Sequence, residues 1–230
     1  MSPRPKQNEQ HPNLEAAIKE TAWKQITEFG ASALSLRAIA RELGITAPAI
    51  YNYFQRRDDL VTALIVDAFT SLGESQKNSL TNLPEDDLAA RLTTLGLAYR
   101  DWAVVYPQRY QLIFGTPIPG YKAPADITVP AAAWSLVSLI ETVQAIYISG
   151  RLRMDRFAEM TPELESMLEA WSQFADGTDA KVLYTALVIW SRVHGLVALE
   201  IGNQMPSFIT DPGEIYRREI SAMTDEFLEA

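Results

Sequence analysis

Apolar residues recur along this chain at spacings of three and four, which is the period of helices that bury one face. A first helix is expected over 13–30, where Leu14, Ile18, Ala22, Ile26 and Phe29 form one stripe, with Asn13 as its cap and Gly30 as its end. No stretch alternates for long enough to suggest a strand. The pattern therefore predicts an all-α fold.

The same periodicity divides the rest of the chain into helices. Further helices are expected over 36–43, 46–53, 58–72, 86–106, 107–114, 130–150, 161–174 and 179–202, followed by a last helix that carries Tyr216, Ile220, Met223 and Phe227. The loop over 115–130 is long enough to serve as a lid, or it is a connection without function. The predicted parts are a disordered arm (1–12), a first helical domain (13–57), a linking helix (58–80) and a larger helical domain (81–230).

The stretch 36–54, LRAIARELGITAPAIYNYF, has the spacing of a helix-turn-helix. Two helices that cross at close range favour a methyl-sized side chain where they touch and a residue that tolerates positive φ at the bend. Ala40 and Gly44 meet these two needs. Thr46 is placed to cap the second helix through its hydroxyl, and Ile50 faces inward.

The second helix of this pair turns small and polar residues outward. Such a helix can lie in a DNA major groove, where Asn52 can pair with an adenine and alanine methyls can contact a thymine methyl. The candidate groove residues are Thr46, Ala47, Pro48, Tyr51, Asn52 and Tyr53, and the candidate phosphate contacts are Ser35 and Arg37 with the two tyrosine hydroxyls. The alternatives are a helix pair that only packs and, for Arg37, a solvated surface position.

The run SLRAIARELGITAPAIYNYFQRRDDLVTALI resembles the DNA-binding domain of the TetR family of transcriptional regulators, over 13–64. Its most specific part is YNYF followed by a basic residue and an acidic pair. Family members commonly have a histidine where Tyr53 stands and a lysine where Arg57 stands. Tyr53 keeps a hydrogen-bonding tip and Arg57 keeps the charge, so the resemblance adds Arg57 to the candidate DNA contacts.

Two later segments, YPQRYQLIFGTPIPGY (106–121) and WSRVHGLVALEI (190–201), resemble a subgroup of TetR regulators with a Trp and His-Gly signature in the C-terminal domain. The resemblance implies that the two closing helices meet their copies in a four-helix bundle, so that a homodimer carries two reading heads. Two half-sites are the usual route to specific affinity.

Charge and composition agree with this interpretation once the chain is divided. The net charge is -9, but residues 1–62 carry +1 and the remainder -10, so the acidic residues lie mostly outside the reading head. The absence of cysteine excludes a disulfide framework and a thiolate metal site, and it favours a cytoplasmic protein. The N-terminus lacks the apolar core of a secretory signal. The most apolar run, 184–201, contains Arg192, His194 and Glu200, which favours a buried helix over a membrane span.

Aromatic residues of the C-terminal part are candidates for lining a small-molecule pocket. They are Trp102, Tyr106, Tyr110, Trp134, Tyr147 and Trp171, together with His194 and, more weakly, Phe114 and Tyr184. Plain core packing is the alternative for each of them. His194 can hydrogen-bond a ligand or satisfy a neighbouring carbonyl.

The usual enzyme motifs are missing, because the chain has no Gly-rich phosphate loop, no cysteine nucleophile, no Gly-x-Ser-x-Gly elbow and no histidine pair with ligand spacing. The sequence predicts a transcriptional regulator without cofactor or metal, a repressor that binds a palindromic double-stranded DNA operator as a homodimer and is released by an unknown small-molecule effector. The alternative is an all-helical small-molecule-binding protein or enzyme with an incidental helix-turn-helix.

Overall fold

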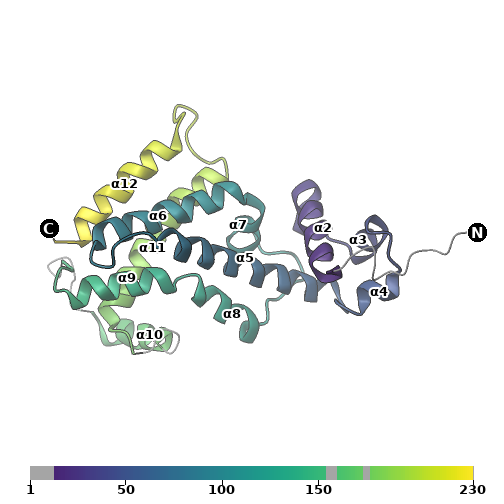
Figure 1. The fold of residues 1–230 in the computed structure, drawn as a ribbon, viewed down its shortest axis with the longest axis horizontal. Coiled ribbons are helices and arrows are strands. Elements are labelled where there is room, and N and C mark those ends of the chain that lie inside the picture. Colours follow the sequence, from purple (N-terminus) through teal and green to yellow (C-terminus); the bar gives the residue numbers. More distant parts are fainter. Residues whose placement is uncertain (1–12, 154–159, 173–176, 230) are drawn as a thin grey trace, which may run out of the picture. The chain divides into compact units, whose positions relative to one another are not determined.

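The computed structural model describes residues 13–153, 160–172 and 177–229, and within these ranges the chain is helical, with no strand and one isolated bridge between Leu152 and Leu228 (Figure 1). The all-α prediction is confirmed. Contacts divide the chain into two compact units. One unit comprises the described residues up to Ala68 together with Gln108–Thr128, and the other comprises Phe69–Pro107 with the described residues from Val129 onward.

The smaller unit contains the predicted reading head. Its elements are α2 (Leu14–Phe29), the 3-10 turn η1 (Ala31–Ala33), α3 (Leu36–Glu42), α4 (Ala47–Tyr51) and the first part of α5 (Arg57–Ser79). Asn13 caps α2 by accepting a hydrogen bond from the Ala16 amide (3.1 Å), and Gly30 ends the helix at φ 79°. Both predicted helix boundaries are confirmed.

The core of this unit is made by residues from four helices. Ile18, Ile39, Ile50 and Leu60 are all fully buried. Phe29 was expected in the same stripe, but that prediction is wrong, because its side chain is 68 % exposed. Phe29 is the last residue of α2, immediately before the chain turns at Gly30, so it lies at the rim of a surface groove instead of in the core.

A segment from the middle of the chain packs into the smaller unit. It includes most of α7 (Pro107–Phe114) and the loop that follows. The hydroxyls of Thr62 on α5 and Tyr121 in the loop lie 2.9 Å apart, and the Arg109 guanidinium lies 5.3 Å from the ring centroid of Trp23 on α2. The division at residue 80 did not anticipate these contacts, since hydrophobic patterning cannot show which unit a loop joins.

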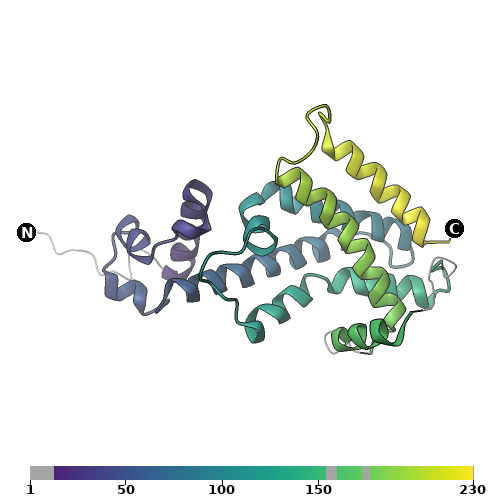
Figure 2. The ribbon, with the colours of Figure 1, turned by 180° about the vertical axis from the view of Figure 1, so that it is seen from behind.

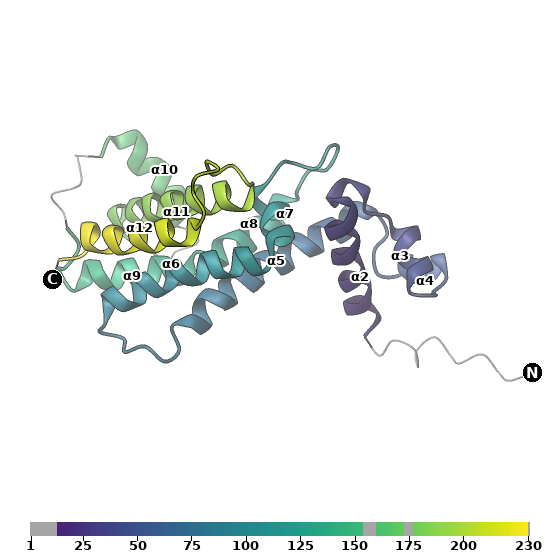
Figure 3. The same ribbon diagram turned by 90° about the horizontal axis from the view of Figure 1, so that it is seen from above.

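The larger unit is a stack of long helices. It is built from α6 (Leu88–Val105), α9 (Val137–Ile148), α10 (Pro162–Ser172), α11 (Ala180–Ile201) and α12 (Pro212–Phe227), with the later parts of α5 and α8 (Ala125–Trp134). Figure 3 shows α11 and α12 forming one layer over α6 and α9; α6 contacts the other three helices, and α11 contacts α9 and α12. The predicted α12 stripe is confirmed, because Tyr216, Ile220, Met223 and Phe227 are all buried.

The prediction of one continuous helix over 130–150 is wrong, because two helices, α8 and α9, meet there at a bend of 49°. Pro130 lies inside α8 instead of starting a helix, so the preceding loop ends at Pro124. At the junction the Ser135 hydroxyl donates to the carbonyl of Ala132 (2.7 Å), which competes with regular helical bonding. The Gln76 amide on α5 donates to the freed carbonyl of Ser135 (3.3 Å).

Helix α11 is the central helix of the larger unit. Among the described residues, α11 is long and apolar enough to cross a membrane. Helices α8 and α9 would be long and apolar enough only if they formed one bent span. Helix α11 nevertheless packs against α6, α9, α10 and α12, and Figure 2 shows it between α10 and α12. Its Arg192 pairs with Glu219 and Glu226 of α12, and its Glu200 with Arg100 of α6. The prediction of a buried helix is confirmed.

Candidate nucleic-acid interface

The turn between α3 and α4 has the geometry that its sequence predicted. Gly44 has φ 66°, in the left-handed region that disfavours a Cβ. The Ile45 amide donates to the carbonyl of Ala40 (2.9 Å), which closes the end of α3. Ala40 is 3 % exposed and Ile50 is fully buried, so the two helices touch through a small residue and one inward anchor.

Helix α4 begins at Thr46, but not through the hydroxyl that was expected to cap it. Thr46 occupies the N-cap position without a side-chain cap bond. A capping hydroxyl accepts from the second or third amide of its helix. Pro48 is the second residue and has no N–H, while the amide of Ala49, the third, already donates to the Thr46 carbonyl (3.0 Å). The Thr46 hydroxyl therefore stays on the exposed surface.

The outward face of α4 and its exit is exposed and carries no acidic side chain. The predicted groove residues Thr46, Ala47, Pro48, Tyr51, Asn52 and Tyr53 are all exposed. Tyr51 and Tyr53 are 37 % and 48 % exposed, while Ile50 before them and Phe54 after them are buried. The buried pair fixes the helix against the head, so the structure brings these six residues together on one surface.

The two predicted phosphate contacts on α3 differ in their present partners. The Ser35 hydroxyl accepts from the Ala38 amide (3.4 Å) as the helix cap, and its proton remains available for donation. Arg37 is exposed, and within the described ranges its guanidinium has no hydrogen-bond or ion-pair partner. An unpaired cation beside a helix N-terminus can contact a phosphate without first breaking an ion pair.

Arg57 lies at the start of α5 and is already engaged inside the head. Its Nη2 donates to the carbonyl oxygens of Ala31 (2.9 Å) and Ser32 (3.3 Å) in the turn after α2. Its Nε is buried without a partner among the described residues. Sequence reasoning missed this bracing contact, because the turn and the arginine are distant in sequence. The Arg57 guanidinium therefore already donates hydrogen bonds within the head in the absence of DNA.

Arg56 is an exposed cation next to this brace that sequence reasoning did not select. Its Nη2 lies 2.8 Å from Oδ1 of Asp59, and its amide donates to Oδ2 of the same carboxylate (2.9 Å). The hydrogen bond from the Arg56 side chain lowers the pKa of Asp59 below its usual value. The acidic pair at the start of α5 therefore has one member neutralised locally.

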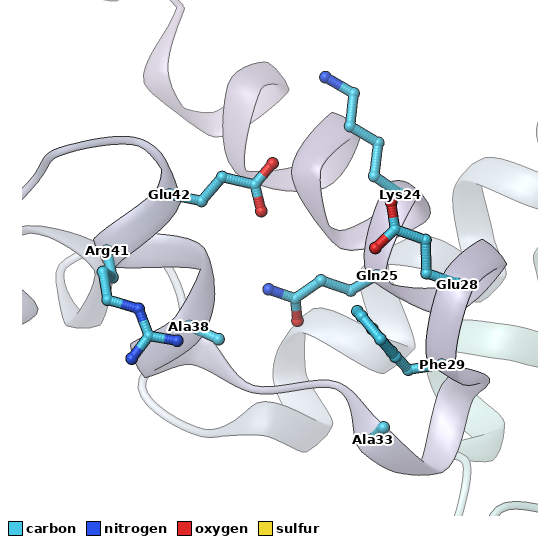
Figure 4. A pocket seen from close by; sticks show the side chains of 8 residues that line it. All are labelled: Lys24, Gln25, Glu28, Phe29, Ala33, Ala38, Arg41 and Glu42. Atoms are coloured by element: carbon cyan, nitrogen blue, oxygen red, sulfur yellow. The ribbon is translucent and has the colours of Figure 1, made fainter.

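A separate groove of about 530 Å³ lies on the head between α2, η1 and α3 (Figure 4). Lys24 and Arg41 line it, but so do the carboxylates of Glu28 and Glu42. In Figure 4 the Gln25 amide points into the space between the helices. Because acids offset the cations here, this groove is a poor phosphate site compared with the α4 surface.

The aromatic candidates for a ligand pocket are dispersed over the fold. Buried Trp102 donates from Nε1 to the hydroxyl of Ser71 (3.0 Å), and buried Tyr110 packs on Phe114 in the smaller unit. Tyr106 and Trp134 are exposed, while the side chains of Tyr147, Trp171 and Tyr184 are half-buried. Phe174 and the arm over 1–12 lie outside the described residues.

His194 is the exception among these candidates, because it contacts two residues that line a cavity. Its Nδ1 lies 3.1 Å from the Tyr99 hydroxyl, and its ring stacks on Trp190 at a centroid distance of 5.0 Å. Tyr99 and Trp190 line a cavity of about 20 Å³ in the larger unit, together with Gln76 of α5. Sequence reasoning did not select Tyr99 or Gln76, because a helical pattern shows buried faces and not the spaces between them.

In the described residues, the head has a helix pair anchored inward, an outward face without acidic residues and an exposed Arg37 without a partner. Joined to a helical domain, such a head defines a helix-turn-helix DNA-binding regulator. Comparison with known proteins agrees. Residues 18–64 match the family model for bacterial regulatory proteins of the tetR family, and residues 92–223 match the model for the Tetracyclin repressor-like C-terminal domain. The chain belongs to the TetR family of transcriptional regulators, and it is a regulator and not an enzyme.

Similar proteins extend over nearly the whole chain. The HTH-type transcriptional regulator Mb1846 of Mycobacterium bovis is 31 % identical over 212 residues, which cover 92 % of this chain and 91 % of that protein. The crystal structure of SCO4313, described as a candidate regulatory protein, is 34 % identical, covers 96 % of this chain and 98 % of the other, and has a TM-score of 0.75. A TetR variant of Acinetobacter baumannii shares the fold, with 16 % identity, a TM-score of 0.54 and coverage of 92 % and 94 %.

Proposed function

We propose that this regulator is a cytoplasmic repressor that binds a palindromic operator as a homodimer and leaves it when a small-molecule effector binds the larger unit. The observation that carries the DNA-binding part is the exposed α4 surface with Ala47, Tyr51 and Asn52, in a stretch (46–54) that contains no acidic residue. Asn52 reads an adenine edge, and the small side chain of Ala47 lets the helix approach the bases. Ser35, Arg37 and Tyr53 contact phosphates, and so does Nη1 of Arg57, which lies 3.9 Å from Oδ1 of Asp58.

The homodimer forms through α11 and α12. A groove of about 710 Å³ runs between these helices and is lined by Ser191, Arg192, Gly195, Leu196, Ile215, Arg218, Glu219 and Ala222. Leu187, Leu199 and Ile215 on the same helices are 37–39 % exposed. A Cβ placed on Gly195 would meet no atom within 4 Å, so there is room for a helix of a second copy. A self-complementary face of this kind makes a two-fold dimer with two reading heads.

Release by an effector is supported by the cavity beside Tyr99 and Trp190 and by the shared helix α5. Residues of α5 belong to both compact units, and Gln76 of α5 lines the cavity. A ligand shifts an equilibrium only by its different affinities for the two states. A related fold can hold such a ligand, since the Acinetobacter baumannii protein was crystallised in complex with minocycline.

The reading face is tested by fluorescence anisotropy on duplexes that the wild-type protein has selected from a random pool. Asn52→Ala should weaken binding about ten- to hundredfold, the range expected for the loss of a bidentate base contact. Tyr51→Ala should weaken it as well. Asn82→Ala is the matched control, because Asn82 is an exposed asparagine of the larger unit. Full affinity in both the Asn52 and Tyr51 variants would show that α4 is not the reading helix.

A further inference from the structure

The cavity in the larger unit is closed down to about 20 Å³, which is room for about one water molecule. Its walls come from α5, α6, α9, α11 and α12. Aliphatic side chains of Leu92, Leu95, Leu139, Ile189 and Val193 make up most of the surface. Any larger occupant must therefore push these side chains apart, and it must be apolar enough to be stabilised by contact with them.

Among the residues that the structure describes, no charged side chain lines this cavity. The ion pair between Arg100 and Glu200 is closed on itself at 2.6 Å, and neither residue belongs to the lining. An ion that entered would lose its hydration without gaining a counter-charge, and that loss costs several kcal/mol or more. The lining thus selects against both carboxylates and ammonium groups.

Among the described residues, Tyr99 and Gln76 line the cavity with a hydroxyl and an amide, beside the indole of Trp190, and the first two differ in what they can offer. The Tyr99 hydroxyl is held by Nδ1 of His194 at 3.1 Å. Gln76 is 3 % exposed, and its Nε2 reaches the Ser135 carbonyl over a long 3.3 Å, while its Oε1 receives no hydrogen bond from the described residues. A buried amide that is half-satisfied has hydrogen-bonding capacity left for a ligand.

The partner of Gln76 lies at the break between α8 and α9. Ser135 precedes Leu136, and Leu136 and Leu139 form the wall of the cavity on that side. The break leaves the Ser135 carbonyl outside regular helical bonding, and the Gln76 amide is its hydrogen-bond donor. The α8–α9 junction is therefore the wall that can move when the cavity expands.

We infer that the effector is an uncharged, largely apolar molecule with one hydrogen-bond donor, which donates to Oε1 of Gln76 while Nε2 keeps the Ser135 carbonyl; its role as effector rests on the proposed function. The apolar body occupies the space that opens between α6, α9 and α11. A ligand bound in the cavity contacts α5 through Gln76, and the residues of α5 belong to both compact units. Ligand binding can therefore act on α5 directly.

The test compares three probes with one chain length, namely 1-octanol, octanoate and octylammonium, on the full-length protein without DNA. Saturable binding is followed by the thermal unfolding midpoint and by tryptophan emission, to which Trp190 in the cavity wall contributes as one of five tryptophans. 1-Octanol should raise the midpoint and bind at least tenfold more tightly than either ion. Equal or tighter binding of an ion, or no saturable binding of any probe, would overturn the inference.

Two variants locate the binding. Leu139→Trp fills the cavity and should abolish 1-octanol binding, whereas Ile148→Trp, at a 76 % exposed position of the same helix, should not. Gln76→Met keeps the length of the side chain and should weaken binding about three- to tenfold, the loss of one hydrogen bond; Gln204→Met is the exposed control. Unchanged binding in a folded Leu139→Trp protein would place the site elsewhere.

The effect on DNA separates this inference from the proposed function. If 1-octanol binds as described and also lowers DNA affinity, both stand. If it binds in the cavity and DNA affinity stays the same, the chemistry of the site stands and ligand release fails. If adding 1-octanol lowers the DNA affinity of the Leu139→Trp variant as much as that of the wild type, the probe acts outside the cavity and the inference fails.

Discussion

Nη2 of Arg57 lies 2.9 Å from the carbonyl oxygen of Ala31, and this contact ties the start of α5 to the turn after α2. The two residues are 26 positions apart, and both belong to the smaller unit. A charged donor on a backbone carbonyl is worth about 1.5–3 kcal/mol when the contact is well formed. The head therefore depends on Arg57 for its own stability before it depends on it for DNA.

Replacing Arg57 tests this brace. Arg57→Met should lower the free energy of unfolding by about 1–3 kcal/mol, since the carbonyls lose a donor in a half-buried position. Arg57→Lys should recover only part of the loss, because an ammonium lacks the planar fork. Denaturant unfolding of the full chain measures both. Equal stability of the Met variant and the wild type would contradict a structural role for Arg57.

The bend of the helix pair offers a second stability test. Gly44 has φ 66°, and a Cβ there would meet nothing within 4 Å, so the cost of a side chain is backbone strain alone. Gly44→Ala should destabilise the head by about 1–2 kcal/mol. Gly44→Asn should cost clearly less, because asparagine adopts this conformation more readily. If the two variants unfold at the same denaturant concentration, strain at this bend does not govern the turn.

His194 predicts a dependence of stability on pH. Burial lowers the pKa of His194 below 6.5, so the unfolded chain binds this proton more readily than the folded one. The contribution to stability is present above pH 6.5 and is lost as the pH falls through the lowered folded value. As the pH falls below 6.5, the wild type should lose stability more steeply than the His194→Asn variant. The asparagine amide does not titrate, and it places a polar group where Nδ1 of His194 contacts the Tyr99 hydroxyl. Parallel pH profiles of the unfolding free energy would contradict this.

The proposed dimer face can be broken at one position. Gly195→Glu places a charge in the open groove between α11 and α12 and should convert the dimer to a monomer, measured by light scattering after size-exclusion chromatography. Ile148→Glu, at an exposed position of α9, is the matched control and should stay dimeric. A dimer that survives Gly195→Glu would place the interface on another surface.

The reading head could be predicted from sequence almost residue by residue, because its determinants are local. Gly44 at the bend, Ala40 at the crossing and Ile50 as anchor each follow from spacing within one short stretch. The failed capping by Thr46 was also readable in principle, because Pro48 supplies no amide at the position where the hydroxyl would bind.

The larger unit was predicted less well, because its determinants are contacts between distant segments. The bend between α8 and α9 depends on Ser135 and on the packing of Trp134 against Gly73 of α5. A Cβ on Gly73 would lie 2.8 Å from the Trp134 side chain. The cavity is defined by Tyr99 and Gln76, which fit a buried helical face as well as a pocket wall. Periodicity cannot distinguish these two roles.

The central claim, that two copies of this chain read a palindrome through α4, is tested most directly by sequencing duplexes that the wild-type protein selects from a random pool. Selection at near-physiological salt should enrich one sequence with two inverted half-sites about 10–10.5 base pairs apart, or a multiple of that. The selected duplex should bind two copies or a multiple of two. Enrichment of a single unrepeated half-site by a folded dimer, or no enrichment at all, would contradict the account.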